Sequence, residues 1–202
     1  MVVQEKRDRL FEIVESQHGI FTTQQAVDAG YDRKTHTYQV KMGYWIREHR
    51  GIYRLAHYPY DEESEWVIWS LWSRDRKGNS QGVYSHDTAL TMYDLSDINP
   101  SKLHMTVSKS FRKNSLIPSH LRIHTGELSE VGDIEERQGY RVTTPFRTIQ
   151  DMCSEDAIDR DLIHQAITQA IQRGLISHRE RKAALISASF PEWAKQIFKN
   201  EA

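Results

Sequence analysis

Side chains that carry positive charge or donate hydrogen bonds recur in the first quarter of the chain. Such groups bind phosphate oxygens and the edges of bases, so their chemistry is that of nucleic-acid recognition. Each could by itself be an ordinary solvated charge, but together they predict one binding surface. The candidate DNA-binding residues are Thr22, Thr23, Gln24, Arg33, Lys34, Thr35, Thr37, Lys41, Arg47, Arg50 and Arg54.

Two short helices are expected to position most of these side chains. A helix over residues 24–29 follows two threonines that can cap it, and it ends at Gly30, a residue type that often follows helices. Asp32 caps a second helix over residues 33–42, which ends at Gly43. The second helix carries the charged and hydroxyl side chains that are typical of a recognition helix.

A two-stranded ribbon is expected after these helices. Residues 45–48 and 52–55 have the pattern of strands, and Arg50-Gly51 forms the bend between them. An upstream helix is needed to bury a core, and its apolar residues follow helical spacing: Leu10, Ile13 and Val14. This order of elements is that of a winged helix-turn-helix, which places its second helix in the major groove and its wing on the backbone. We therefore expect residues 1–57 to bind double-stranded DNA.

The charge of the chain is segregated. The formal net charge of −1 at first argues against binding to a polyanion. However, residues 1–60 hold 9 basic against 7 acidic residues, whereas residues 61–100 hold 3 against 8. Residues 101–125 hold 5 basic residues and no acidic one. A second basic surface is therefore expected there, on an exposed loop with Lys109, Arg112 and Lys113.

The 202 residues leave room for a second domain, which we expect to span residues 61–202. Expected strands cover residues 82–84, 103–107, 121–124 and 140–143, and expected helices cover residues 61–72, 86–93, 144–152, 161–173 and 178–199, with a break at Pro191. The predicted fold class is therefore α+β. A winged helix-turn-helix is followed by a mixed α/β domain with a small sheet and several helices.

No catalytic or metal centre is expected in the second domain, so we predict neither an enzyme nor a bound cofactor. The triplet that begins at Glu180 has the E-x-K pattern of some nucleases, but no acidic residue on a preceding strand accompanies it. His120 and His124 would lie about 13 Å apart along a strand, too far for one metal ion. We expect capping or packing roles for His86 and Asp87.

The cellular compartment is indicated by three further features. A single cysteine, Cys153, excludes an intramolecular disulfide and is expected to be a packed thiol. No apolar run approaches the roughly 20 residues that cross a bilayer. The N-terminal residues lack the apolar region of a signal peptide. A cytoplasmic protein without a membrane partner is therefore expected.

Five short motifs occur in an order that resembles one known family. They are RGIYRL (50–55), SHDTAL (85–90), LHMTVSKSFR (103–112), VTTPFRTIQDM (142–152) and AITQAIQRGLIS (166–177). With the N-terminal unit, they are similar to the AbiEi-type antitoxins of bacterial abortive-infection (type IV) toxin–antitoxin systems. The resemblance implies a repressor that binds the promoter or operator of its own operon. It also implies a nucleotidyltransferase-like toxin as the functional partner, with or without a direct complex.

Two features leave alternatives open. The chain departs from the family's pattern at His36 and Gln39, where apolar residues are expected, so the register of the recognition helix is not determined. In an alternative function, the winged helix contacts protein or RNA without recognising an operator, and the basic segment 101–125 is the main binding surface.

Overall fold

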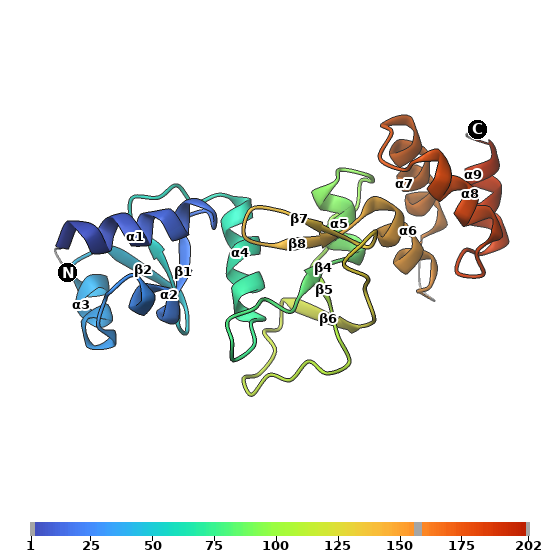
Figure 1. The fold of residues 1–202 in the computed structure, drawn as a ribbon. Coiled ribbons are helices and arrows are strands. Elements are labelled where there is room, and N and C mark those ends of the chain that lie inside the picture. The colour runs from blue at the N-terminus through green and yellow to red at the C-terminus, as the bar shows by residue number, and fades with distance from the viewer. Residues whose placement is uncertain (1–2, 156–158, 201–202) are drawn as a thin grey trace. The chain divides into compact units, whose positions relative to one another are not determined.

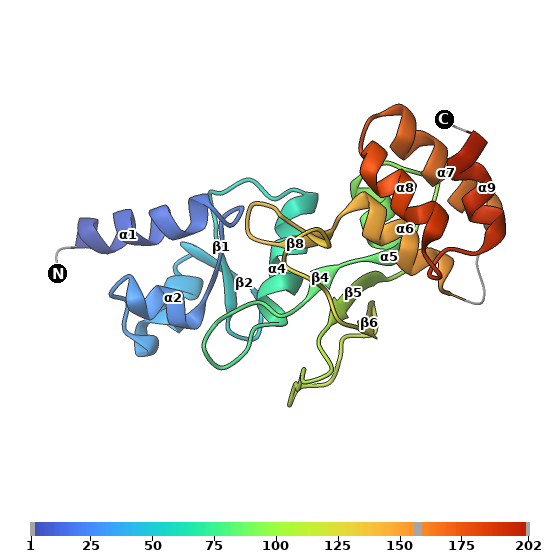
Figure 2. The same cartoon turned by 45° about the vertical axis from the view of Figure 1, so that its right-hand side comes forward.

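The computed structural model describes residues 3–155 and 159–200, in which the chain forms two compact units. Unit 1 contains the described residues up to Gly82 together with Glu136–Tyr140, and unit 2 contains the rest. Figure 1 and Figure 2 show the elements of each unit from two directions. Helices accompany a small sheet in each unit, so the expected α+β class is confirmed.

Unit 1 contains the helices and strands of a winged helix-turn-helix in the expected order. They are α1 (Val3–Glu15), β1 (Ile20–Thr22), α2 (Thr23–Asp28), the 3₁₀-helix η1 (Arg33–Thr35), α3 (His36–Lys41), β2 (Trp45–His49), β3 (Ile52–Leu55) and α4 (Glu62–Trp72). The strands pair antiparallel in the order β1-β3-β2. Strand β1 was not expected, and the single helix expected over residues 33–42 is divided into η1 and α3.

The core of unit 1 is largely aromatic. Phe21 on β1 is fully buried, and its ring meets the edge of Trp45 on β2 with the ring centroids 4.8 Å apart. Tyr31 and Tyr53 lie against the same indole, at centroid distances of 5.0 and 5.7 Å. Apolar residues from the first two helices complete this core: Leu10, Val14, Ala26 and Ala29. The i, i+4 spacing in α1 therefore does mark its buried face.

Helix α4 packs within unit 1, so the compact units divide at Gly82 rather than before this helix. Val67 and Trp72 are almost completely buried. The ring of Trp66 lies 5.3 Å from that of Tyr140, which belongs to the separate segment of the same unit. An apolar helix stays with the surface that it covers, and here that surface includes β1 and β3.

Unit 2 is built on a five-stranded mixed sheet. Its elements are β4 (Val83–Tyr84), α5 (His86–Met92), β5 (Leu103–Val107), β6 (Leu121–Thr125), β7 (Ile134–Glu136), β8 (Arg141–Thr143), α6 (Pro145–Cys153), α7 (Arg160–Gln172), α8 (His178–Ile186) and α9 (Glu192–Asn200). The strand order is β6-β5-β4-β8-β7. Strand β4 is antiparallel to β5 and parallel to β8, and β5 is parallel to β6. The short strand β7 was not expected.

The helices of unit 2 pack in succession. Helix α5 contacts α6 and β5, α6 contacts α7, and α9 contacts both α7 and α8. Thr144 caps α6 and Pro145 occupies its first turn, as their types predict. Cys153, at the end of α6, is half-buried, and burial raises the pKa of its thiol to about 12. Within the described residues, no helix is both long and apolar enough to cross a membrane.

Candidate nucleic-acid interface

Residues 33–42, expected to form the recognition helix, are called the recognition segment here. The segment begins as the 3₁₀-helix η1 and continues as helix α3. Asp32 is the N-cap, and its Oδ1 atom accepts a hydrogen bond from the backbone N–H of Lys34 at 2.8 Å. The Thr35 hydroxyl donates to the Asp32 carbonyl oxygen at 2.7 Å. The Thr35 hydrogen is therefore used within its own turn, whereas the Lys34 side chain extends into solvent.

His36 determines which face of the recognition segment is buried. Its side chain is only 3% exposed, and its ring lies 5.1 Å from Trp45 and 5.9 Å from Tyr53. Burial lowers the pKa of the His36 imidazole below its ordinary value, so the ring behaves as the apolar residue expected there. Gln39 is half-buried, which fits the same inward face. In the register that the structure shows, His36 therefore faces the core of unit 1.

The exposed face of the recognition segment and the wing carry cations that no acidic group neutralises. Lys34, Lys41, Arg47 and Arg50 are exposed. Across residues 3–155 and 159–200, no carboxylate lies within ion-pair distance of any of these four side chains. Thr37 is exposed on α3 among them. Cations left without protein partners are suited to contact phosphates.

Arg33 and Gln24 connect the two helices of the helix-turn-helix. The Arg33 guanidinium donates to the side-chain oxygen of Gln24 at 2.9 Å. The amide of Gln24 in turn donates to the carboxylate of Asp28 at 2.9 Å. All three side chains are exposed, so these bonds orient the arginine without removing it from solvent.

The turn of the wing is held against the rest of unit 1. Gly51 has a φ of +73°, a conformation that side chains other than glycine rarely adopt. Its carbonyl oxygen accepts hydrogen bonds from the backbone N–H of Thr23 at 3.0 Å and from the guanidinium of Arg74 at 3.4 Å. The neighbouring Arg50 remains exposed. These hydrogen bonds therefore fix the backbone next to Arg50, while the Arg50 side chain lies in solvent.

Two of the candidate DNA-binding residues make bonds within the fold, and a third is only partly exposed. Thr22 is 4% exposed, and its hydroxyl accepts the backbone N–H of Gln25 in a capping box. Thr23 is half-buried behind the wing turn. Arg54 donates to Glu48 at 2.7 Å and to the carbonyl of Tyr58 at 3.0 Å. The side chains of Thr22 and Arg54 are therefore engaged within unit 1.

Comparison with known proteins agrees with this geometry. Residues 8–56 match the family model described as "Transcriptional regulator, AbiEi antitoxin". This segment, called the AbiEi segment below, is similar to that family, and the match covers less than half of the chain. The whole chain is also similar to the crystal structure of the RV2827C protein from Mycobacterium tuberculosis, with a TM-score of 0.57 and 10% identity over 97% of this chain and 75% of that one. At this identity the likeness is one of fold alone. No curated protein matches the chain.

The second basic surface lies outside the AbiEi segment, and its three cations differ in their contacts. Lys109 lies 3.8 Å from the carboxylate of Glu127. Arg112 donates to the carbonyl oxygens of Lys109 and Phe111 at 2.9 and 2.7 Å, and Lys113 is half-buried. Arg112 is thus engaged by the backbone of its own loop, whereas Lys109 remains exposed.

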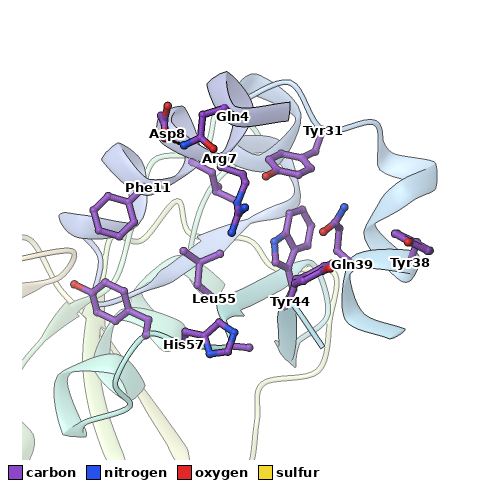
Figure 3. A pocket seen from close by; sticks show the side chains of 14 residues that line it. Gln4, Arg7, Asp8, Phe11, Tyr31, Tyr38, Gln39, Tyr44, Leu55 and His57 are labelled. Atoms are coloured by element: carbon purple, nitrogen blue, oxygen red, sulfur yellow. Dashed lines mark hydrogen bonds between the residues drawn. The ribbon is translucent and has the colours of Figure 1, made fainter. Parts of the chain in front are cut away.

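A groove of about 690 Å³ lies beside α3, lined mostly by residues of the AbiEi segment (Figure 3). Exposed aromatic rings border it, with Phe11 and Tyr44 each 51% exposed and Tyr38 56% exposed. The groove has no local signal in the sequence, because its walls come from α1, α3 and the segment after β3. Its mostly apolar lining distinguishes it from the cationic surface formed by α3 and the wing.

Proposed function

We propose that unit 1 binds double-stranded DNA, with the exposed face of η1 and α3 in the major groove and the wing on the phosphate backbone. The observation that carries this proposal is a set of four exposed cations that have no carboxylate partner among the described residues: Lys34, Lys41, Arg47 and Arg50. Buried His36 turns the opposite face of α3 toward the core, which leaves the polar face available. The docking geometry of helix-turn-helix proteins requires this division of faces.

We further propose that the bound DNA lies upstream of the chain's own gene and that binding represses transcription. The family of residues 8–56 is one of antitoxin transcriptional regulators, which supports a regulatory role. In the same proposal, the chain counteracts a nucleotidyltransferase-like toxin encoded in the same operon. Unit 2 contributes to that antitoxin activity, with or without a stable complex.

DNA binding is tested by fluorescence anisotropy with the duplex upstream of the gene and a shuffled duplex of equal length. A specific site should bind at least about 1,000-fold more tightly than the shuffled duplex at physiological salt. Equal affinities for the two duplexes would contradict operator recognition. No binding to either duplex at low salt would refute DNA binding altogether.

The same assay separates the alternative in which the basic loop binds protein or RNA. A variant with Lys109→Ala, Arg112→Ala and Lys113→Ala should bind the upstream duplex as the wild type does. If instead this variant loses nucleic-acid binding while Lys34→Ala retains it, the loop is the binding surface. A single-stranded RNA probe of the same sequence shows which nucleic acid is preferred.

The antitoxin role is tested in a bacterial host that expresses the neighbouring nucleotidyltransferase-like gene. Growth should stop when that gene is induced alone and resume when the full chain is expressed with it. The toxin is transcribed from an unrelated promoter, so that repression of the native promoter cannot restore growth. Under this promoter, a Lys34→Ala, Lys41→Ala variant that is impaired in DNA binding should restore growth as the wild type does. Failure of the wild type to restore growth there would reject the antitoxin proposal and leave the DNA-binding proposal standing.

A further inference from the structure

Three metal-ligating side chains converge in unit 2 from positions far apart in the sequence. His86 begins α5, His124 lies on β6, and Glu155 follows α6. One ligand atom from each lies within 4.8 Å of the other two. In the sequence, His120 is the histidine nearest to His124, and the wide spacing of His86, His124 and Glu155 gives no local signal. Topology alone brings them together.

Glu155 presents a single oxygen to both imidazoles. Its Oε1 atom lies 3.6 Å from Nε2 of His86 and 3.5 Å from Nδ1 of His124. Its Oε2 atom lies 3.5 Å from the guanidinium of Arg122, which orients the carboxylate. Ligands at about 2.0 Å from a tetrahedral zinc ion stand about 3.3 Å apart. The two distances from Oε1 to the imidazole nitrogens are therefore close to the ligand–ligand distance of such a site.

Two further side chains continue the row beyond His124. Its Nε2 atom lies 3.4 Å from Nδ1 of His104, and Nε2 of His104 lies 3.8 Å from Oδ2 of Asp87. The row from Glu155 to Asp87 thus has three polar contacts, but two neutral imidazoles supply only two N–H groups. At one contact two lone pairs must then face each other, either those of a nitrogen and an oxygen or those of two nitrogens. A cation between Glu155 and His124 removes this conflict and leaves both histidines donating toward Asp87, as second-shell partners of metal ligands do.

The backbone and the neighbouring hydroxyls orient the His86 ring. His86 has a φ of +53°, which is uncommon for a residue other than glycine. Ser85 is the N-cap of α5, but its hydroxyl makes no capping bond. That hydroxyl lies 2.9 Å from Nδ1 of His86 and accepts a hydrogen bond from Thr106 at 2.8 Å. The Ser85 hydroxyl thus contacts the imidazole and not the helix N-terminus, and the His86 ring is held with Nε2 toward Glu155.

We propose that unit 2 binds a divalent transition-metal ion, with zinc as the best match, through His86, His124 and Glu155. Two imidazole nitrogens and one carboxylate oxygen are a ligand set that zinc accepts. A cavity of about 250 Å³ borders all three ligands, which leaves space for water as a fourth ligand. The His86 and His124 rings stack 3.6 Å apart, so each must turn about its own side-chain bonds to direct its lone pair at the ion. This inference is independent of the proposed DNA binding.

Binding is tested on the full chain without an affinity tag, after removal of metals with a chelator. Isothermal titration with zinc chloride should show one ion per chain, and cobalt chloride should give the visible absorption of a nitrogen- and oxygen-ligated ion. His86→Asn and Glu155→Gln should each weaken zinc binding at least about 100-fold, and His104→Ala should weaken it about 10- to 100-fold. The matched controls His164→Asn and Glu127→Gln alter exposed side chains and should bind as the wild type does.

Circular dichroism shows whether each variant retains its fold. If a ligand variant unfolds, the histidine ring nitrogens of the wild type are followed by NMR during the zinc titration, and those of His86 and His124 should shift. The proposal is overturned if the wild type binds neither zinc nor cobalt when each ion is present at about 100 µM, because any weaker affinity would be nonspecific. It is also overturned if folded His86→Asn or Glu155→Gln binds zinc unchanged, or if other histidine rings shift instead.

Discussion

Removing three cations from the recognition segment and wing should reduce the salt dependence of DNA binding by a calculable amount. The variant combines Lys34→Ala, Lys41→Ala and Arg50→Ala. These three side chains are exposed and have no carboxylate partner in residues 3–155 and 159–200. Each phosphate contact contributes about 0.9 to the slope of log affinity against log salt. If all three contact phosphates, the slope becomes about 2.7 less steep.

The corresponding change in affinity is large enough to measure. Between 50 and 200 mM salt, the wild type should lose about 40-fold more affinity than the variant, because a fourfold change in salt is raised to the power of about 2.7. The variant should also bind more weakly at the lowest salt. The assay is fluorescence anisotropy with the upstream duplex, repeated at four salt concentrations.

A second variant separates local contacts from net charge. Arg179→Ala, Lys182→Ala and Lys199→Ala removes three exposed cations from α8 and α9 and changes the net charge of the chain by the same amount. Its slope should equal that of the wild type. If both variants flatten the slope equally, the effect comes from net charge and the proposed interface is wrong. An unchanged slope in the first variant refutes the phosphate contacts directly.

Three further outcomes concern the residues that support the interface. Thr22→Ala should lower the free energy of unfolding by about 1 kcal/mol through loss of the N-cap, measured by urea denaturation, whereas exposed Thr37→Ala should not. Arg54→Ala should lower the urea midpoint because Glu48 loses its partner, while the salt slope of DNA binding stays unchanged. His36→Phe should flatten the dependence of stability on pH. Because burial lowers the pKa of folded His36, the unfolded chain binds the proton first, and stability falls as pH drops below about 6.5. Equal pH dependence in His36→Phe and the wild type would refute that assignment.

Local signals in the sequence predict most of the helices and strands. Caps such as Asp32 and Thr144 and the bend at Arg50-Gly51 act within a few residues, so they can be recognised without the fold. Strands β1 and β7 were missed because each has only three residues, and β1 also pairs with β3, which is distant in the sequence. The period of a helix can be recognised within one segment, whereas a short strand is stabilised by the strand with which it pairs.

The sites were less predictable than the elements. Residue type alone suggests DNA contact for Thr22 and Arg54, but burial and hydrogen bonding assign both to the fold. Conversely, His36 departs from the family's apolar pattern and still packs as a core residue against Trp45. His86 and Glu155 were not connected at all, because only the mixed sheet and its helices bring them near each other.

The discontinuity of unit 1 limits how this unit can be separated from the rest of the protein. The chain leaves unit 1 at Gly82 and contributes Glu136–Tyr140 to it again later. A fragment that stops at residue 82 would lack the ring of Tyr140 and expose the face of Trp66 that this ring covers. A gene fusion or recombination event with one crossover would therefore transfer an incomplete unit. Exchange of unit 1 between related proteins requires two crossovers, or a substitution that makes residue Trp66 polar.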